Sequence, residues 1–205
     1  MNKDLKNKRL ILGSQSPRRH SLIKKLNVDF DVVSPDCDEK LDSDIYSDDK
    51  IKSLSLQKSL SILKAKNPTN SLVISADTVV ISDSKILGKP KDEAQAHEML
   101  RALSGKTHYV VTAVTVLDCD TGKYLSDTVK TYVTFQDLSD ELIDDYIKTF
   151  KPLDKAGAYG VQEMGPDFIK SVDGCLDNVI GLPVERLKQM LVEMGYDFSM
   201  PCAQG

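Results

Sequence analysis

The polar segment at residues 14–19, Ser-Gln-Ser-Pro-Arg-Arg, combines residue types that bind phosphate. It follows a short apolar run and leads into a helical pattern, which predicts a helix N-terminus within it. Such a terminus presents unpaired backbone N–H groups and the positive end of the helix dipole, and an arginine fork binds two phosphate oxygens at once. The segment therefore predicts a phosphate-binding turn, with a capped helix whose basic first turn is simply solvated as the alternative.

Three lysines lie in contexts that are unusual for surface lysines. Lys58 lies on an apolar helical stripe, Lys89 lies between Gly88 and Pro90, and Lys155 begins a glycine-rich segment. Together with the two arginines, these ammonium groups could neutralise a polyphosphate. The alternative is a structural role for each of them, and for Lys58 in particular an ammonium that reaches out past the edge of the core.

Two groups of carboxylates suggest acid–base or metal chemistry. Asp77 lies in the middle of residues 71–82, a β-branched run that predicts a strand, and burying its charge costs several kcal/mol unless a cation or hydrogen bonds compensate. Asp77 is therefore expected to pair with a cation or to bind a metal. Asp36, Asp38 and Glu39 lie in one polar loop, and carboxylates from two elements beside a phosphate site could hold Mg²⁺. A solvated acidic surface is the alternative for this loop.

Several common catalytic motifs are absent from the sequence. It has no G-x-x-x-x-G-K-[ST] phosphate loop, no G-x-G-x-x-G fingerprint, no H-E-x-x-H pair and no G-x-S-x-G turn. The three histidines, His20, His97 and His108, have no catalytic partner at a recognisable spacing. We therefore expect them to be structural or surface residues.

Alternating strand and helix patterns surround these chemical segments and predict one α/β unit over residues 1–205. The expected strands cover residues 9–12, 28–33, 71–82, 107–117, 124–135 and 168–172, and the turn at 120–122 joins two of them into a hairpin. The expected helices begin after Ser16, at Lys50, after Asp92, after Ser139 and at Pro183. Residues 34–49 are expected to form a loop.

Composition limits the partners of the chain. It has 205 residues, with 27 Lys and Arg against 31 Asp and Glu, for a formal net charge of -4. This acidity disfavours nucleic-acid polymers and anionic membranes as partners, and no apolar run approaches the roughly 18 residues of a membrane span. The charged N-terminus is not expected to act as a secretory leader. The scattered cysteines, Cys37, Cys119, Cys175 and Cys202, are expected to be reduced thiols in a cytoplasmic protein.

Eight segments, taken in chain order, resemble motifs of the Maf family of nucleoside triphosphate pyrophosphatases. They are residues 14–19, Asp38-Glu39, the helical stretch 54–59, Ser-Ala-Asp-Thr-Val-Val at 75–80, and residues 87–90, 103–108, 154–162 and 178–183. The resemblance implies hydrolysis of a nucleoside triphosphate to the monophosphate and pyrophosphate, with a divalent cation, Mg²⁺ or Mn²⁺, as cofactor. It also implies a fold like that of the inosine triphosphate pyrophosphatases, an elongated mixed sheet flanked by helices, with two lobes around a cleft.

The same resemblance assigns roles to individual residues. Asp77 would accept the proton of the water that attacks the α-phosphorus and would share the metal with Glu39. The triphosphate would be bound by Ser14, Ser16, Arg18, Arg19, Lys58 and Lys89. A homodimer is also implied. Departures from the family pattern, chiefly Gly13 and the serines Ser55 and Ser59 in place of alanines, concern packing more than chemistry.

Three positions resemble those that separate the family's branches by base. Arg18, Thr78 and Gln162 match the branch that acts on dTTP and UTP, with CTP or modified pyrimidine nucleotides as further substrates. A hydroxyl and a carboxamide supply uncharged donors and acceptors that suit the O/N–H/O edge of uracil or thymine. The alternatives are a 7-methyl-GTP pyrophosphatase and a nucleotide-binding regulator of cell division without turnover.

Overall fold

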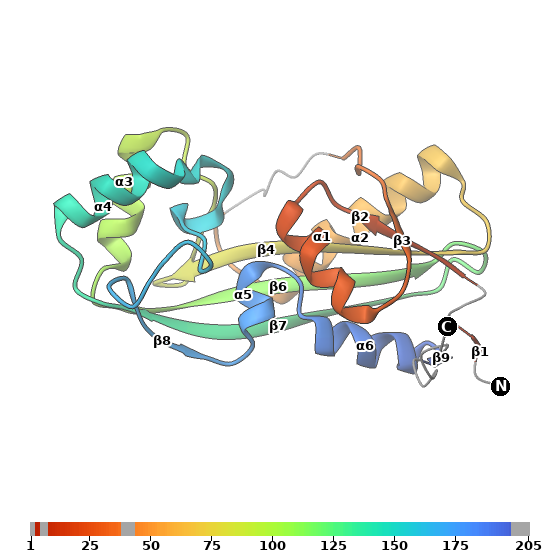
Figure 1. The fold of residues 1–205 in the computed structure, drawn as a ribbon. Helices are drawn as coiled ribbons and strands as arrows, with labels where there is room; N and C mark the ends of the chain where they lie inside the picture. Colours follow the sequence, from red (N-terminus) through yellow and green to blue (C-terminus); the bar gives the residue numbers. More distant parts are fainter. Residues whose placement is uncertain (1–2, 5–7, 38–43, 198–205) are drawn as a thin grey trace.

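A computed structural model describes residues 3–4, 8–37 and 44–197 of the chain (Figure 1). Within these residues a seven-stranded mixed sheet has the order β3-β2-β4-β6-β7-β8, and β5 pairs with β4. Its strands are β2 (Arg9–Gly13), β3 (Phe30–Val32), β4 (Ser71–Ser82), β5 (Lys85–Leu87), β6 (Thr107–Asp118), β7 (Tyr124–Phe135) and β8 (Ile169–Asp173). β2 runs parallel to β3 and β4, and the other pairings are antiparallel. A separate pair joins β1 (Lys3–Asp4) to β9 (Tyr196–Asp197).

The three central strands, β4, β6 and β7, have 12 residues each and run the length of the molecule. One lobe at their end holds β2, α1 (Pro17–Ile23), α2 (Asp48–Lys66) and α6 (Val184–Glu193); the other holds α3 (Glu93–Leu103) and α4 (Asp140–Phe150) (Figure 1). The β-branched composition of β4, β6 and β7 favours extended backbone. The predicted strand at residues 71–82 and the predicted hairpin are confirmed.

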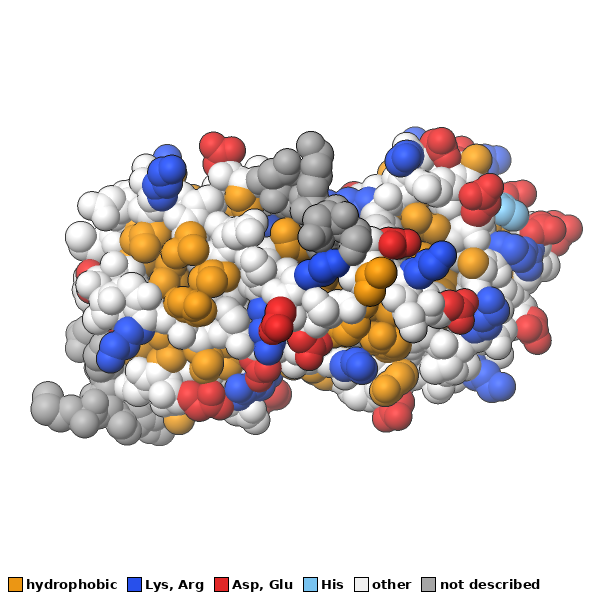
Figure 2. Space-filling model, turned by 180° about the vertical axis from the view of Figure 1, so that it is seen from behind, with side chains coloured by type: hydrophobic (Ala, Val, Ile, Leu, Met, Phe, Trp, Pro, Cys, Tyr) orange, Lys and Arg blue, Asp and Glu red, His pale blue; other side chains and the backbone are white. Residues whose placement is uncertain are grey.

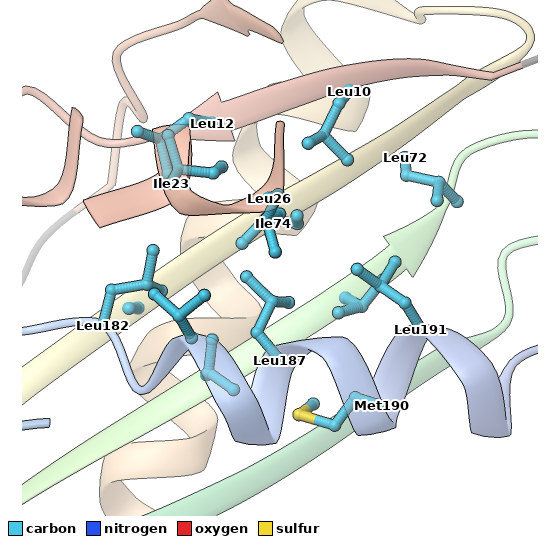
Figure 3. Packing of buried hydrophobic residues seen from close by; sticks show 14 of the residues in the cluster. Leu10, Leu12, Ile23, Leu26, Leu72, Ile74, Leu182, Leu187, Met190 and Leu191 are labelled. Carbon is cyan, nitrogen blue, oxygen red and sulfur yellow. The ribbon is translucent and has the colours of Figure 1, made fainter. Parts of the chain in front are cut away.

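Side chains alternate between the faces of a strand, and this alternation assigns the helices to the two faces of β4. Leu72 and Ile74 face α1 and α6, where they pack with Leu187 and other apolar residues (Figure 3). Val73 faces the opposite side and packs against Ile62 of α2. In the second lobe, Val80 packs into the cluster formed by α3 and α4. The core therefore covers both faces of the sheet.

Helix starts follow the capping residues in the sequence. The side chains of Asp92 and Ser139 accept hydrogen bonds from the backbone N–H groups of Gln95 and Leu142, as expected for the N-cap residues of α3 and α4. Ser16 holds the N-cap position of α1, but its side chain makes no capping hydrogen bond there. The start predicted at Lys50 is two residues late, because α2 begins at Asp48.

Other departures from the predicted elements are short. β3 covers only residues 30–32 of the expected strand at 28–33. The helix α5 (Leu176–Ile180) was not expected. Five residues give too few turns for an apolar period to show.

The open edge of β4 is interrupted between its two smaller partners. β2 pairs with β4 as far as Ser75, and β5 pairs with it only from Val80 onward, while β6 covers the other edge throughout. Among the described strands, none pairs with residues 76–79 on the open side. We call this stretch the strand gap; it lies between the two lobes.

The structure also describes the surface charges, the hydropathy of the helices and part of the cysteines. On the face shown in Figure 2, acidic and basic side chains lie interspersed. No helix in the described ranges combines the length and the hydropathy needed to cross a bilayer. Cys119 and Cys175 are free thiols, and Cys202 lies outside the described residues.

Candidate active site

A cleft of about 670 Å³ opens at the strand gap between the two lobes. Its walls come from the start of α1, from α2, from β4 and from the loop at residues 154–162. All the site residues predicted within the described ranges line it, namely Ser14, Ser16, Arg18, Arg19, Lys58, Asp77, Thr78, Lys89 and Gln162. The remaining one, Glu39, lies outside the described residues, as does Asp38. The fold thus brings segments far apart in the sequence into one space.

Asp77 and Thr78 reach this cleft from opposite faces of the sheet. Because they are consecutive in β4, their side chains point to opposite sides. The carboxylate of Asp77 contacts Lys58 of α2, whereas the hydroxyl of Thr78 contacts Arg19 of α1. Both are accessible from one cleft because no described strand covers this part of β4. The strand gap is therefore the feature that creates the site.

A buried ion pair forms the cleft wall on the α2 side. Lys58 Nζ lies 2.5 Å from Asp77 Oδ1, and the two side chains are 5% and 13% exposed. Asp77 was expected to pair with a cation, and this is confirmed. The alternative in which Lys58 reaches out past the core is wrong, because its ammonium is directed inward. The ammonium of Lys58 thus offsets the cost of burying most of the Asp77 carboxylate.

Serine hydroxyls fix α2 against β4 next to this ion pair. Ser55 donates to the carbonyl oxygen of Ser75 at 3.1 Å, and the hydroxyls of Ser59 and Ser75 are hydrogen-bonded to each other. Ser55 and Ser59 flank Lys58 at a distance of three residues and one residue in the sequence. The two serines that depart from the family pattern therefore hold the helix that carries Lys58.

At the start of α1, hydrogen bonds organise the predicted phosphate-binding turn. Ser14 Oγ accepts from the backbone N–H of Ser16 at 3.1 Å and from Arg19 at 3.4 Å. Arg19 also donates from Nε to the carbonyl oxygen of Gly181 at 2.8 Å and from its second terminal nitrogen to Thr78 Oγ1 at 2.9 Å. The guanidinium is thus held from three sides at the cleft.

Arg18 connects the two lobes at the edge of the cleft. It lies 3.1 Å from Asp154, whose carboxylate also accepts from Lys155 at 2.9 Å. Burial opposes ionisation of Asp154, but the hydrogen bonds from Lys155 and Arg18 outweigh it and lower the pKa of the carboxyl group. Lys155 lies 3.2 Å from Glu163 as well. Its charge is countered by two carboxylates, which fits the structural alternative for this lysine.

Behind the loop that carries Gln162, a buried histidine supports the cleft wall. His108 Nε2 lies 2.7 Å from the hydroxyl of Tyr159, which lines the cleft. Burial lowers the pKa of His108 to about 4, so the imidazole is neutral at neutral pH. His108 is therefore a structural residue, as expected.

Among the residues that the structure describes, Asp77 is the carboxylate in the cleft that was expected to bind a metal. The described residues contain no group of three or more His, Cys, Asp and Glu side chains arranged to hold a metal ion. Asp36 is not among the cleft residues, and its backbone N–H donates to Ser61. A cation there would bind Asp77 and take its other ligands from substrate and water, a donor set that suits Mg²⁺.

Sequence reasoning missed two buried polar residues behind the cleft, Thr112 and Asn178. Both are fully buried and hydrogen-bonded to each other. A signal for Asn178 was present, since it begins the family-like motif at residues 178–183. Thr112 lies in an ordinary β-branched run, and its role depends on a contact 66 positions away in the chain.

Comparisons with known proteins agree with this geometry. The family model described as Maf-like protein matches residues 9–194. A dTTP/UTP pyrophosphatase of Caldicellulosiruptor saccharolyticus is 41% identical over 192 residues, which are 93% of this chain and 96% of the relative. Another, of Alkaliphilus oremlandii, is 44% identical over 189 residues, which are 90% and 95% of the two chains.

A solved structure of a HAM1 protein from Coxiella burnetii resembles this fold. It aligns with a TM-score of 0.50 at 12% identity and covers 91% of this chain and 99% of its own. At such low identity the likeness concerns the fold alone. The expected fold class, an elongated mixed sheet flanked by helices with two lobes around a cleft, is confirmed.

Proposed function

The chain belongs to the Maf family, and from this premise we propose that it hydrolyses dTTP and UTP to the nucleoside monophosphate and pyrophosphate. Relatives that are 41% and 44% identical over at least 90% of the chain are dTTP/UTP pyrophosphatases. The observation that carries the proposal is the cleft at the strand gap, which brings Asp77 together with the predicted phosphate-binding cations Arg18, Arg19, Lys58 and Lys89. A nucleoside triphosphate is an anion that matches this distribution of charge.

In the proposed reaction, Asp77 is the proton acceptor. Its Oδ1 accepts from Lys58, and its second oxygen takes a proton from the water that attacks the α-phosphorus. The bond from the α-phosphorus to the bridging oxygen breaks, and pyrophosphate leaves. The cations Arg18, Arg19, Lys58 and Lys89 would balance the charge of the phosphates, so catalysis would depend on positioning and electrostatic stabilisation.

We further propose that a divalent cation, Mg²⁺ or Mn²⁺, binds at Asp77, with Glu39 as a second carboxylate ligand. When bound, such an ion supplies positive charge to the phosphate oxygens and orients water. Among the described residues, Asp77 is the proposed carboxylate ligand, and this fits a cation that takes most of its other ligands from substrate and water. A cytoplasmic location and a homodimer complete the proposal, and both rest on the composition and the family resemblance.

For the base, Thr78 and Gln162 would provide uncharged hydrogen-bonding groups in the cleft that Arg18 also lines. A carboxamide can donate to a carbonyl oxygen of uracil or thymine and accept from the ring N–H. An acidic side chain at position 162 would instead favour a guanine edge. This chemistry supports dTTP and UTP over 7-methyl-GTP.

Pyrophosphate release from dTTP, UTP, CTP and 7-methyl-GTP, each with Mg²⁺ and with a chelator, tests the proposal. We expect turnover of dTTP and UTP that the chelator abolishes. Turnover of 7-methyl-GTP alone would show that the base assignment is wrong. Binding of nucleotide without turnover of any of the four would favour a regulatory binding protein.

A further inference from the structure

We infer that Thr112 is a positioning residue for Arg19, acting through Thr78, and that Asn178 sets the direction of the hydrogen bonds between them. The inference rests on the proposed function in one respect, namely that Arg19 binds the triphosphate. Thr112 is fully buried and does not line the cleft. Its effect on a ligand must therefore pass through other side chains.

A chain of hydrogen bonds leads from the cleft to the backbone of α5. Arg19 donates to Thr78 Oγ1 at 2.9 Å, the hydroxyls of Thr78 and Thr112 lie 2.9 Å apart, and Thr112 Oγ1 lies 2.8 Å from the carbonyl oxygen of Asn178. A carbonyl only accepts, so the proton of Thr112 points to Asn178. The Thr112 oxygen must then accept from Thr78, because a hydroxyl has one proton.

This direction decides what Thr78 can offer to Arg19. With its own proton committed to Thr112, the Thr78 oxygen presents lone pairs to the guanidinium, which can only donate. Without an acceptor at position 112, the Thr78 hydroxyl could turn its proton toward Arg19. Its oxygen would then no longer present lone pairs to the guanidinium. Bonds linked in this way also strengthen one another.

Asn178 anchors the far end of this chain and the second contact of Arg19. Its amide nitrogen donates to the Val110 carbonyl at 3.1 Å and to Thr131 at 3.0 Å, and its amide oxygen accepts from the backbone N–H of Thr112 at 3.1 Å. Three residues later in the chain, the carbonyl of Gly181 accepts from Arg19 Nε. The same anchored segment thus holds two sides of the guanidinium.

A double-mutant cycle with inorganic tripolyphosphate as the ligand tests this inference. Tripolyphosphate has no base and reports phosphate binding without requiring turnover of a nucleotide. We expect Thr112→Val to weaken its binding about fivefold, roughly the value of one hydrogen bond, and Thr112→Ser to restore it. In an Arg19→Ala background, Thr112→Val should have no further effect, because the group through which it acts is gone.

Thr115→Val is the matched control. Thr115 lies on the same strand and is equally buried, but it points to the other face, and its hydroxyl bonds to Ser126 at 2.7 Å. We expect wild-type affinity from this variant. If Thr112→Val does not fold, Thr78→Val removes the next group of the same chain and replaces it in the cycle.

Three results would overturn the inference: equal effects of Thr112→Val in both backgrounds, equal effects of Thr112→Val and Thr115→Val, or no binding of tripolyphosphate by the wild-type chain. A wild-type chain that binds tripolyphosphate but does not hydrolyse dTTP or UTP would refute the proposed function. The cycle would remain readable in that case, so the two failures are distinguishable.

Discussion

At the scale of single residues, the buried pair of Lys58 and Asp77 is the centre of the site. An isolated carboxylate in a strand interior is costly, and here the ammonium of Lys58 offsets that cost at 2.5 Å. Retaining a charged group in this place requires a compensating reason, and proton transfer is one that carboxylates commonly serve. The pair therefore links the stability of the fold to its proposed chemistry.

We predict that Asp77→Asn lowers kcat for dTTP and UTP by at least about 100-fold, the usual size of a general-base contribution. The amide oxygen can still accept from Lys58, so the fold should persist, which circular dichroism and thermal unfolding would verify. Asp144→Asn, an exposed position on α4, serves as the control and should leave kcat unchanged. Near-wild-type turnover by Asp77→Asn would remove Asp77 from its proposed role.

Residue identity allowed part of this site to be predicted. Asp77 in a strand and Lys58 on an apolar stripe were both unusual placements, and the ion pair between them explains both. Their pairing could not be read from the sequence, because it depends on how α2 lies over β4. The contacts of Arg19 were further out of reach, since its carbonyl partner, Gly181, is 162 positions away.

At the scale of elements, α2 packs closely against β2 because residue 13 is glycine and has no side-chain methyl group. A Cβ at Gly13 would lie 2.7 Å from Ile62 Cδ1 and 3.3 Å from Ser75 Oγ. Gly13 is not among the glycines with positive φ, so its backbone would accept alanine. The side chain of Ile62 occupies the space that an alanine methyl would need, and this explains why glycine suits position 13 in this chain.

We predict that Gly13→Ala destabilises the protein by about 1–3 kcal/mol through overpacking, despite the lower chain entropy of alanine in the unfolded state. Ile62→Val removes the obstructing Cδ1. In that background Gly13→Ala should be close to neutral, so the double variant is more stable than the sum of the single changes. Urea unfolding measures all three, and additive effects would contradict the packing explanation.

Long elements, in which a sequence pattern repeats several times, were predictable, and short elements were not. The strands β4, β6 and β7 and the helices α3 and α4 follow from β-branched runs and capping residues. The five-residue α5 gave no period, although it carries the carbonyl oxygen and the amide that organise Thr112. The strand gap was also beyond prediction, because it depends on where β2 and β5 stop pairing with β4.

At the scale of the whole molecule, two buried groups make folding sensitive to acid in different ranges. His108 is buried and its pKa is lowered from 6.5 to about 4. At Asp118, burial alone would raise the pKa, but hydrogen bonds from Tyr196 and Lys8 outweigh it and hold the pKa well below 3.8. Tyr196 and Lys8 come from opposite ends of the described chain, so this carboxylate fastens both to the end of β6.

We predict two stages of acid destabilisation. From pH 6.5 down to about 4, the unfolded chain binds a proton that folded His108 refuses, so the free energy of unfolding should fall by about 3 kcal/mol. Below pH 3.8, the unfolded chain protonates Asp118 before the folded one does, and its stabilisation is lost in turn. Urea unfolding at a series of pH values measures both stages.

His108→Gln should flatten the first stage and leave the second. Glutamine does not titrate, and its amide can still bond to Tyr159. A wild-type slope between pH 6.5 and 4 in this variant would contradict the assignment to His108.

At the strand gap, the alternation of side chains along β4 makes the site sensitive to insertions. Asp77 and Thr78 serve different helices only because one is odd and the other even along β4. A single-residue insertion between Ser75 and Asp77 would exchange their faces and bring the carboxylate to the arginine and the hydroxyl to the lysine. An insertion of two residues would keep both side chains on their present faces and shift only their position along β4. In this part of β4, an insertion of an odd number of residues therefore disrupts the site more than an insertion of an even number.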